Sequence, residues 1–189
     1  MKFVNKMSKH TFWLMFAAFL WVMVCNLIVQ AFLTSEAVEA VIGNIGWTIF
    51  LANVLFFIKN NPNTKEALLE NALGGIFGLL GGFLFLKFVY WAVPAGCPSL
   101  LAKMIPIAIF LFLTIALHPM LPYVFNNNAI CFFLVSLINE GTQEGLLEHL
   151  FPHFGGVIVG NLIVNVGTVL IVGFVGKMLA KGKEEPKKE

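Results

Sequence analysis

The segment NALGGIFGLLGGFLFLKFVYWAV, residues 71–93, decides the fold class. It is predominantly apolar, and a helix needs about 20 such residues to cross a bilayer. Gly74, Gly78 and Gly82 recur at every fourth position, a spacing that lets helices in lipid approach closely. We therefore predict a glycine-rich transmembrane helix here and expect it to pair with the glycine-rich last span.

The rest of the chain has the same character. Its 189 residues are 59% hydrophobic and 12% charged, whereas soluble domains carry about 25% charged residues. Its mean hydropathy of +0.87 excludes a water-soluble globular domain. We predict an all-α integral membrane protein. A membrane domain, residues 11–176, would hold six transmembrane helices at 11–33, 38–58, 71–93, 99–117, 123–138 and 154–175.

The distribution of lysine predicts the orientation. Ten of the twelve lysines fall in the N-terminal segment 1–10, the loop after 58 and the tail 177–189, which we expect to be disordered. The loops assigned to the other side contain none. By the positive-inside rule, both termini are cytoplasmic. The apolar run 11–33 is too long for a signal-peptide core, so we expect it to be retained.

The charged residues exclude several classes of function. All basic residues are Lys and all acidic residues are Glu, so the chain has neither an arginine fork for phosphate nor any aspartate. No catalytic motif is present, the cysteines are widely separated, and His149 and His153 have no third metal ligand at a supportive spacing. We expect no enzymatic activity, no cofactor, no metal and no nucleic-acid partner.

An internal similarity appears at an offset of 78 residues. Thr64–Glu70 (TKEALLE) and Thr142–Glu148 (TQEGLLE) are identical at five of seven positions. Each copy leads into a glycine pair, Gly74-Gly75 or Gly155-Gly156, with three extra residues in the second copy. In a six-span chain the copies lie on opposite sides of the membrane. This favours a 3+3 inverted-topology repeat, although two helix starts could share these residues by chance.

Charged residues at the span ends allow two interpretations. Glu66 and Glu70 in one copy, and Glu144 and Glu148 in the other, could be solvated helix starts or could line two cation-favouring vestibules. Lys87 and Lys103 lie near the outer ends of their spans. They could extend to the headgroups or form an outer anion-attracting site.

Amide side chains within apolar runs indicate a polar pathway. His118-Pro119 to Asn128 interrupts a span with two prolines and three asparagines, Asn126, Asn127 and Asn128. Asn161 and Asn165 share one helical face of the last span. The break is either a plain cytoplasmic turn or a place where a transporter coordinates its substrate. Amides in hydrocarbon need partners, so the amides within spans either form interhelical hydrogen bonds or line a substrate pathway.

Several features are similar to an uncharacterised family of short bacterial inner-membrane proteins of the YcdZ type. They are Gly46-Trp47, Phe56-Phe57, the Lys65 to Leu69 loop, the glycine-rich third span and the proline before a glycine-rich last span. The resemblance covers about Gly43 to Gly176. It implies a multi-pass membrane protein and supplies no catalytic or binding residues.

These features predict a small-solute channel or secondary transporter of a bacterial inner membrane. The alternative is a non-transporting scaffold or accessory subunit, which glycine-rich faces would serve equally well. A transporter needs a continuous polar path between its halves, whereas a scaffold needs a dry, glycine-packed centre. The expected partners are the lipid bilayer and further copies of the chain.

Overall fold

The computed structural model describes residues 8–33, 38, 45–58, 64–138 and 140–181. Every regular element in this part of the chain is a helix. In order they are α1 (Lys9–Leu33), α3 (Gly46–Ile58), α4 (Thr64–Ala92), α5 (Ser99–Leu117), α6 (Asn127–Val135), α7 (Glu140–Glu148), α8 (Leu150–Val159), the π-helix η1 (Gly160–Asn165) and α9 (Val166–Lys181).

Four helical stretches are long and apolar enough to cross a bilayer: Lys9–Val29, Thr64–Ala92, Ser99–Leu117 and the continuous Leu150–Ala180. A hydrocarbon core of about 30 Å sets this length requirement. The fold is therefore consistent with the predicted all-α membrane protein.

The other two predicted spans contain short helices. Within 38–58, α3 begins at Gly46 and has 13 residues, while residues 39–44 lie outside the described part. Within 123–138, α6 has only nine residues, or about 14 Å at 1.5 Å per residue. The six predicted spans therefore do not correspond to six full-length helices.

Three predicted boundaries also need correction. The helix expected over 71–93 starts at Thr64, because the polar Thr64–Glu70 repeat continues directly into it. The last helix reaches Lys181, so the tail predicted to be disordered from 177 is helical over its first residues; 182–189 lie outside the described part. The first helix begins at Lys9, inside the predicted N-terminal segment.

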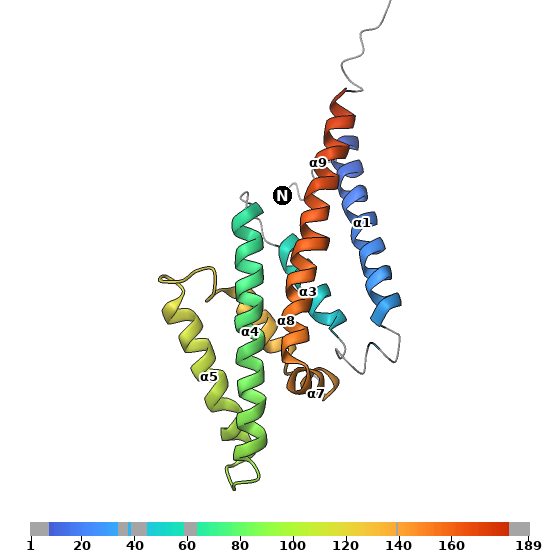
Figure 1. Ribbon diagram of the computed structural model, residues 1–189. Helices are drawn as coiled ribbons and strands as arrows, with labels where there is room; N and C mark the ends of the chain where they lie inside the picture. Colours follow the sequence, from blue (N-terminus) through green and yellow to red (C-terminus); the bar gives the residue numbers. More distant parts are fainter. Residues whose placement is uncertain (1–7, 34–37, 39–44, 59–63, 139, 182–189) are drawn as a thin grey trace, which may run out of the picture.

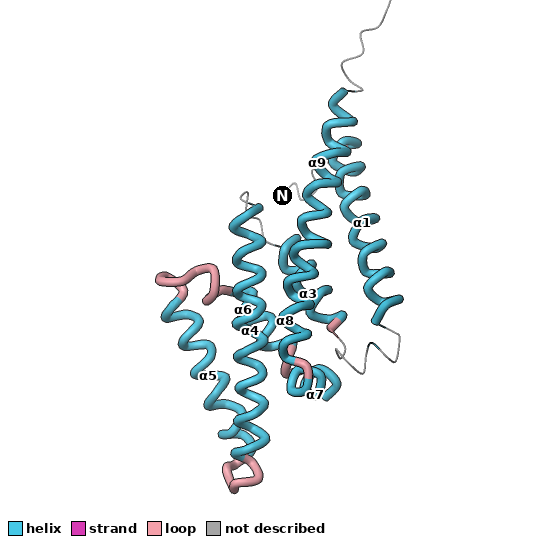
Figure 2. The backbone as a smooth tube through the Cα atoms, in the orientation of Figure 1, coloured by secondary structure: helices cyan, strands magenta, loops and turns pink. Residues whose placement is uncertain are grey.

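The long helices form two pairs, α4 with α5 and α9 with α1 (Figure 1). α4 and the α8–η1–α9 helix run in opposite directions near the centre; α5 packs on α4, and α1 packs on α9. The short helices fill the middle, with α3 against α8 and η1 and α6 against α4. The start of α1 and the end of α9 lie at the same end of the molecule. The loops before and after α5 lie at its opposite ends (Figure 2).

Glycines allow the helices to approach closely, but the helix pairs that they join differ from the expected pairing of the 71–93 helix with the last span. A Cβ on Gly78 of α4 would lie 2.3 Å from the carbonyl oxygen of Ala129 in α6. A Cβ on Gly160 of η1 would lie 2.9 Å from the carbonyl oxygen of Ile49 in α3. α4 does contact α8 and η1. The closest approach of Gly78 is nevertheless to α6, and those of Gly156 and Gly160 are to α3 and the residue before it.

The π-helix η1 lies between the parts of the last helix that face α3 and α1. A Cβ on Gly167, just after η1, would lie 2.5 Å from the Trp21 ring of α1. The Val164 carbonyl within η1 accepts hydrogen bonds from Trp21 Nε1 at 3.1 Å and from Thr168 Oγ1 at 2.7 Å. The two contacts of Trp21 hold α1 against the last helix.

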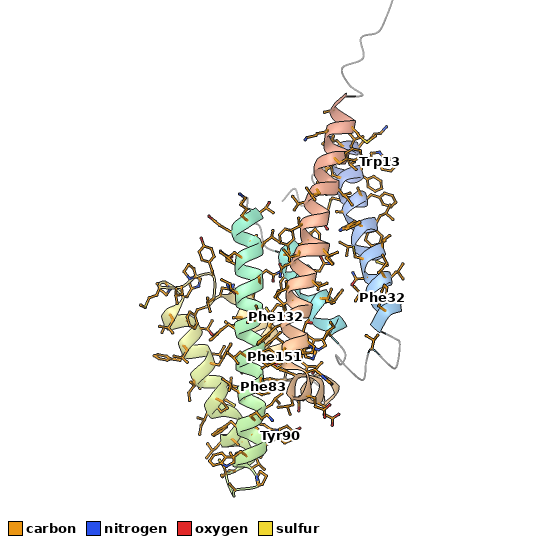
Figure 3. All side chains as sticks on the ribbon, in the orientation of Figure 1. Trp13, Phe32, Phe83, Tyr90, Phe132 and Phe151 are labelled. Atoms are coloured by element: carbon orange, nitrogen blue, oxygen red, sulfur yellow. The ribbon has the colours of Figure 1, made fainter. Side chains whose placement is uncertain are left out.

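Aromatic side chains lie both inside the bundle and on its outer faces. Phe132 and Phe133 of α6 are fully buried together with Leu79, Leu146 and Val157. Trp13 and Phe32 of α1 instead point outward (Figure 3), and both are more than half exposed. Apolar outer faces of this kind suit contact with lipid rather than water.

Candidate functional site

The break between α5 and α6 forms one side of the candidate site. α5 ends at Leu117 and is followed by two prolines, which cannot continue its hydrogen-bonding pattern. The Nδ1 atom of His118 bonds to the carbonyl oxygen of Phe125 across the loop. Because a carbonyl oxygen only accepts, Nδ1 carries the proton, and Nε2 of the neutral ring carries a lone pair.

Asn126 holds this loop against α4 and starts α6. Its Oδ1 accepts hydrogen bonds from the backbone N–H groups of Asn128 and Ala129, at 3.0 and 3.2 Å, as an N-cap residue does. Its Nδ2 donates to three carbonyl oxygens at 3.0–3.1 Å, those of Glu70, Pro122 and Tyr123. The Asn126 amide is therefore used entirely within the protein.

Four buried asparagines form what we call the amide ladder: Asn128 of α6, Asn71 of α4, and Asn161 and Asn165 of η1. Asn128 Nδ2 donates to Asn71 Oδ1 at 3.3 Å, and Asn71 Nδ2 donates to Asn161 Oδ1 at 2.9 Å. Asn165 Nδ2 donates to the same Asn161 oxygen at 3.2 Å. The ladder thus crosses the bundle from α6 through α4 to η1.

Backbone carbonyl groups anchor the ladder at its inner end. The Ala52 carbonyl oxygen of α3 accepts from Asn71 and, at 3.3 Å, from Asn165. Asn161 Nδ2 donates to the Val157 carbonyl oxygen at 2.9 Å. Asn165 Oδ1 is buried without a hydrogen-bond partner. The inner end of the ladder therefore retains one unused acceptor.

A cavity of about 840 Å³ lies at the outer end of the ladder, and we call it the α5–α6 cavity. Ligand pockets typically measure about 300–1,000 Å³. Its polar lining comes from Glu70, Thr114, His118, Asn126, Asn127 and Asn128. Asn127 is exposed, whereas Asn126 and Asn128 are buried. Ladder and cavity meet at Asn128.

The structure separates the residues predicted from sequence into two groups. His118, Asn126, Asn127 and Asn128 line the cavity together with Glu70, which had been assigned to a vestibule. Asn161 and Asn165 join them through the ladder. The remaining charged residues are exposed and line no part of this cavity: Glu66, Glu144, Glu148, Lys87 and Lys103. Lys87 Nζ lies 5.5 Å from the Phe83 ring centroid.

Sequence reasoning missed Asn71 and Thr114 as site residues. Asn71 had been placed at the first position of a span, where an amide would lie at the interface. Because α4 begins at Thr64, Asn71 instead lies two helical turns inside it and is completely buried. If the Thr64–Glu70 repeat had been predicted as the first turns of the helix, Asn71 would have been placed inside the helix.

A second polar contact lies at the α7–α8 junction. His149 Nε2 is 3.8 Å from Glu148 Oε2, and the buried His153 ring lies 5.2 Å from the Trp47 ring centroid. Within the described residues, no group of three or more His, Cys, Asp or Glu side chains could hold a metal ion. The α5–α6 cavity and the ladder are therefore the candidate site.

Comparison with protein-family models, curated proteins and solved structures finds no match for this chain.

Proposed function

We propose that this protein is a small-solute channel or secondary transporter of a bacterial inner membrane. The observation that carries the proposal is the amide ladder, which leads from the α5–α6 cavity into the centre of the bundle. Transporters commonly bind solutes where interrupted helices meet inside the membrane. Here the cavity lies at the α5–α6 break, and the ladder ends in a π-helix, a distortion often found at functional sites.

We further propose a 3+3 inverted repeat relating α1, α3 and α4 to α5, α6 and the α8–η1–α9 helix. α1 packs on α9 as α5 packs on α4, and each short helix packs mainly on the glycine-rich helix of the other half. In Figure 1, a half turn about an axis perpendicular to the page approximately exchanges the α4–α5 pair with the α9–α1 pair. An axis across the helices in this way is typical of inverted repeats.

The glycine contacts support the same relation. Gly78 would meet the Ala129 oxygen and the Phe132 Cβ, while Gly160 would meet the Ile49 oxygen and the Ala52 Cβ. In both cases the two partner residues are three positions apart on the short helix. This pairs Gly78 with Gly160, one position away from the glycine alignment made from sequence. The break at His149, between α7 and α8, accounts for the additional residue.

The proposed topology has both termini in the cytoplasm. Six chain passes of alternating direction, two made partly by the short helices α3 and α6, place the start of α1 and the end of α9 together. Lysines at that end, including Lys9 and Lys177, agree with the positive-inside rule.

Solute flux in proteoliposomes tests the proposal. Stopped-flow light scattering would follow the entry of urea, glycerol and methylammonium chloride. We expect Asn127→Leu, at the cavity, and Asn161→Leu, in the ladder, to insert and fold but to abolish the flux seen for the unchanged protein. Unchanged flux in both variants, or loss of folding in both, would assign these amides to interhelical packing.

A scaffold remains the second candidate because of the close glycine packing of α4 against α6. A Cβ on Gly78 would lie 2.3 Å from the backbone oxygen of Ala129, so these helices meet almost backbone to backbone. Proteoliposomes that show no flux for any of the three solutes would favour this function.

A further inference from the structure

The outer surface between α4 and α5 contains an apolar groove of about 300 Å³, which we call the α4–α5 groove. Every described residue that lines it is apolar, and the lining comes from positions 77–88 of α4 and 105–113 of α5. Leu84 and Ile109 in its wall are more than half exposed. Both helices are long and apolar enough to cross a bilayer, so the groove opens toward lipid acyl chains.

Two lysines lie at the end of the groove next to the loop 93–98. Lys87 is three positions after Leu84, and Lys103 is three positions before Pro106, so each lysine shares a helical face with a groove residue. Lys87 is five residues before the end of α4, and Lys103 is four residues after the start of α5. The two lysines therefore lie at similar depths, about 6–8 Å from the helix ends at 1.5 Å per residue.

The Lys87 side chain points toward the middle of α4 and away from the loop. Its Nζ lies 5.5 Å from the ring centroid of Phe83, one turn farther from the loop, as expected because side chains of an α-helix tilt toward its N-terminus. Between Lys87 and the loop lie Tyr90, labelled in Figure 3, and Trp91, two exposed aromatic residues of the kind enriched at membrane interfaces. The Lys87 charge thus lies on the hydrocarbon side of these residues, where a charge needs a counter-ion.

The described part of the protein supplies no carboxylate as this counter-ion. The sequence contains no acidic residue from position 71 to 139. Within the described residues, no carboxylate forms an ion pair with Lys87 or Lys103. α7 packs on α4, but its Glu144 and Glu148 are exposed. The cation–π contact with Phe83 offsets the Lys87 charge only in part.

We propose that the α4–α5 groove binds an anionic phospholipid of the surrounding membrane. An acyl chain lies along the apolar groove, and the phosphate pairs with Lys87 and Lys103 at the end next to the loop. From the lysines the groove extends toward the middle of both helices, as an acyl chain extends from its headgroup. Two ammonium groups without a carboxylate favour a net negative headgroup over a zwitterionic one. The site shares no lining residue with the α5–α6 cavity and requires no transport.

Binding of four probes tests the inference on the full-length protein in detergent micelles, with native mass spectrometry as the readout. Phosphatidylglycerol has the acyl chains and a net negative charge, whereas phosphatidylcholine with the same chains has a phosphate but no net charge. Diacylglycerol has the chains alone, and glycerol 3-phosphate has the phosphate alone. We expect phosphatidylglycerol to bind at least tenfold tighter than the other three. Binding of any of these three as tight as that of phosphatidylglycerol would overturn the assignment.

Lysine variants locate the headgroup. We expect Lys87→Gln and Lys103→Gln each to weaken phosphatidylglycerol binding at least fivefold and to leave phosphatidylcholine binding unchanged. Lys65→Gln is the matched control, because Lys65 is an exposed lysine at the other end of α4. Lys87→Arg, which keeps the charge, should retain most of the binding and guards against a folding defect. Equal effects of Lys65→Gln and Lys87→Gln would refute the location.

A change in the groove itself tests the position of the acyl chain. Leu80→Trp should fill the groove and weaken phosphatidylglycerol binding at least fivefold, although both lysines remain. Leu73→Trp is the matched control, because Leu73 lies two turns earlier on α4, has the same exposed fraction of 37% and does not line the groove. Unchanged binding by Leu80→Trp, or equal loss in both variants, would remove the acyl chain from the groove.

Disulfide crosslinking tests whether a second copy of the chain covers the groove instead. On a background lacking Cys25, Cys97 and Cys131, Leu84→Cys places a thiol on the exposed wall of the groove. Under an oxidant in native membranes, we expect the chain to remain free of a disulfide-linked dimer. Efficient dimer formation through Leu84→Cys would assign the groove to a protein interface and overturn the lipid site.

Discussion

Asn71 and Asn161 are 90 positions apart in the sequence, yet their side chains share a buried hydrogen bond of 2.9 Å. Asn71 belongs to α4 and Asn161 to η1, so this bond joins the two central helices. It is also the middle step between the α5–α6 cavity and the inner end of the ladder.

Replacement of Asn161 by leucine should destabilise the bundle modestly. The change removes the acceptor shared by Asn71 and Asn165, and interhelical polar contacts in membrane proteins contribute about 0.6–1.7 kcal/mol each. We expect a loss of about 1–2 kcal/mol, measured by reversible unfolding in mixed detergent micelles. Asn26→Leu is the control, because Asn26 donates to the Val22 carbonyl oxygen of its own helix. A larger loss for Asn26→Leu would contradict a stabilising ladder.

Glycine-to-alanine changes should differ in sign according to their surroundings. Gly78→Ala would place a Cβ 2.3 Å from a backbone oxygen, so we expect a loss of about 1–3 kcal/mol. Gly160→Ala, at 2.9 Å, should cost less. Gly173→Ala has nothing within 4 Å and should be neutral or stabilising by up to about 1 kcal/mol, because alanine favours helix. Unfolding of the three variants under one condition gives the order, and the reverse order would argue against tight α4–α6 packing.

Cysteine labelling should reveal the orientation. On a background lacking Cys25, Cys97 and Cys131, we expect Thr142→Cys to react with a membrane-impermeant maleimide from the periplasm. Asn61→Cys should react only after permeabilisation, since lysine-rich loops stay cytoplasmic. The opposite pattern at both sites would invert the proposed topology.

The chain should self-associate. α1 and α5 are little buried within a single chain, and the exposed Gly173 on α9 offers a small-residue surface to another helix. Native mass spectrometry from nanodiscs should give a mass above the 20.9 kDa of one protomer. A mass of one protomer in nanodiscs and in several mild detergents would rule out a stable oligomer.

Apolar length alone predicted the long helices, because crossing a bilayer requires a continuous run that composition reveals directly. It overestimated the span at 123–138. Apolar residues there are as frequent as in a span, but α6 starts only at Asn127, after a loop that ends at the N-cap residue Asn126. It also missed Asn71, since the polar residues before it resemble an interfacial helix start and not the first turns of a buried helix.

The candidate site was predictable only in part for a related reason. An amide in an apolar run signals that it must find a partner, and Asn128, Asn161 and Asn165 did prove to be joined. Which partner each finds depends on how helices distant in sequence pack. The contribution of Glu70 to the cavity is an example. The sequence places Glu70 in a solvated repeat, whereas in the fold Asn126 bonds to its carbonyl oxygen and both residues line the cavity.

The π-helix η1 acts as a phase shift along the last helix. One extra residue in a helical turn rotates everything beyond it by about 100° relative to an uninterrupted α-helix. Gly156 and Gly160 can therefore face α3 while Gly167 faces Trp21 of α1, although all three glycines belong to one continuous helix. Deleting one residue from Gly160–Asn165 would restore the ordinary phase and leave the composition almost untouched. It would also turn Gly167 away from Trp21, so the last helix could pack closely against α3 or against α1 but not against both.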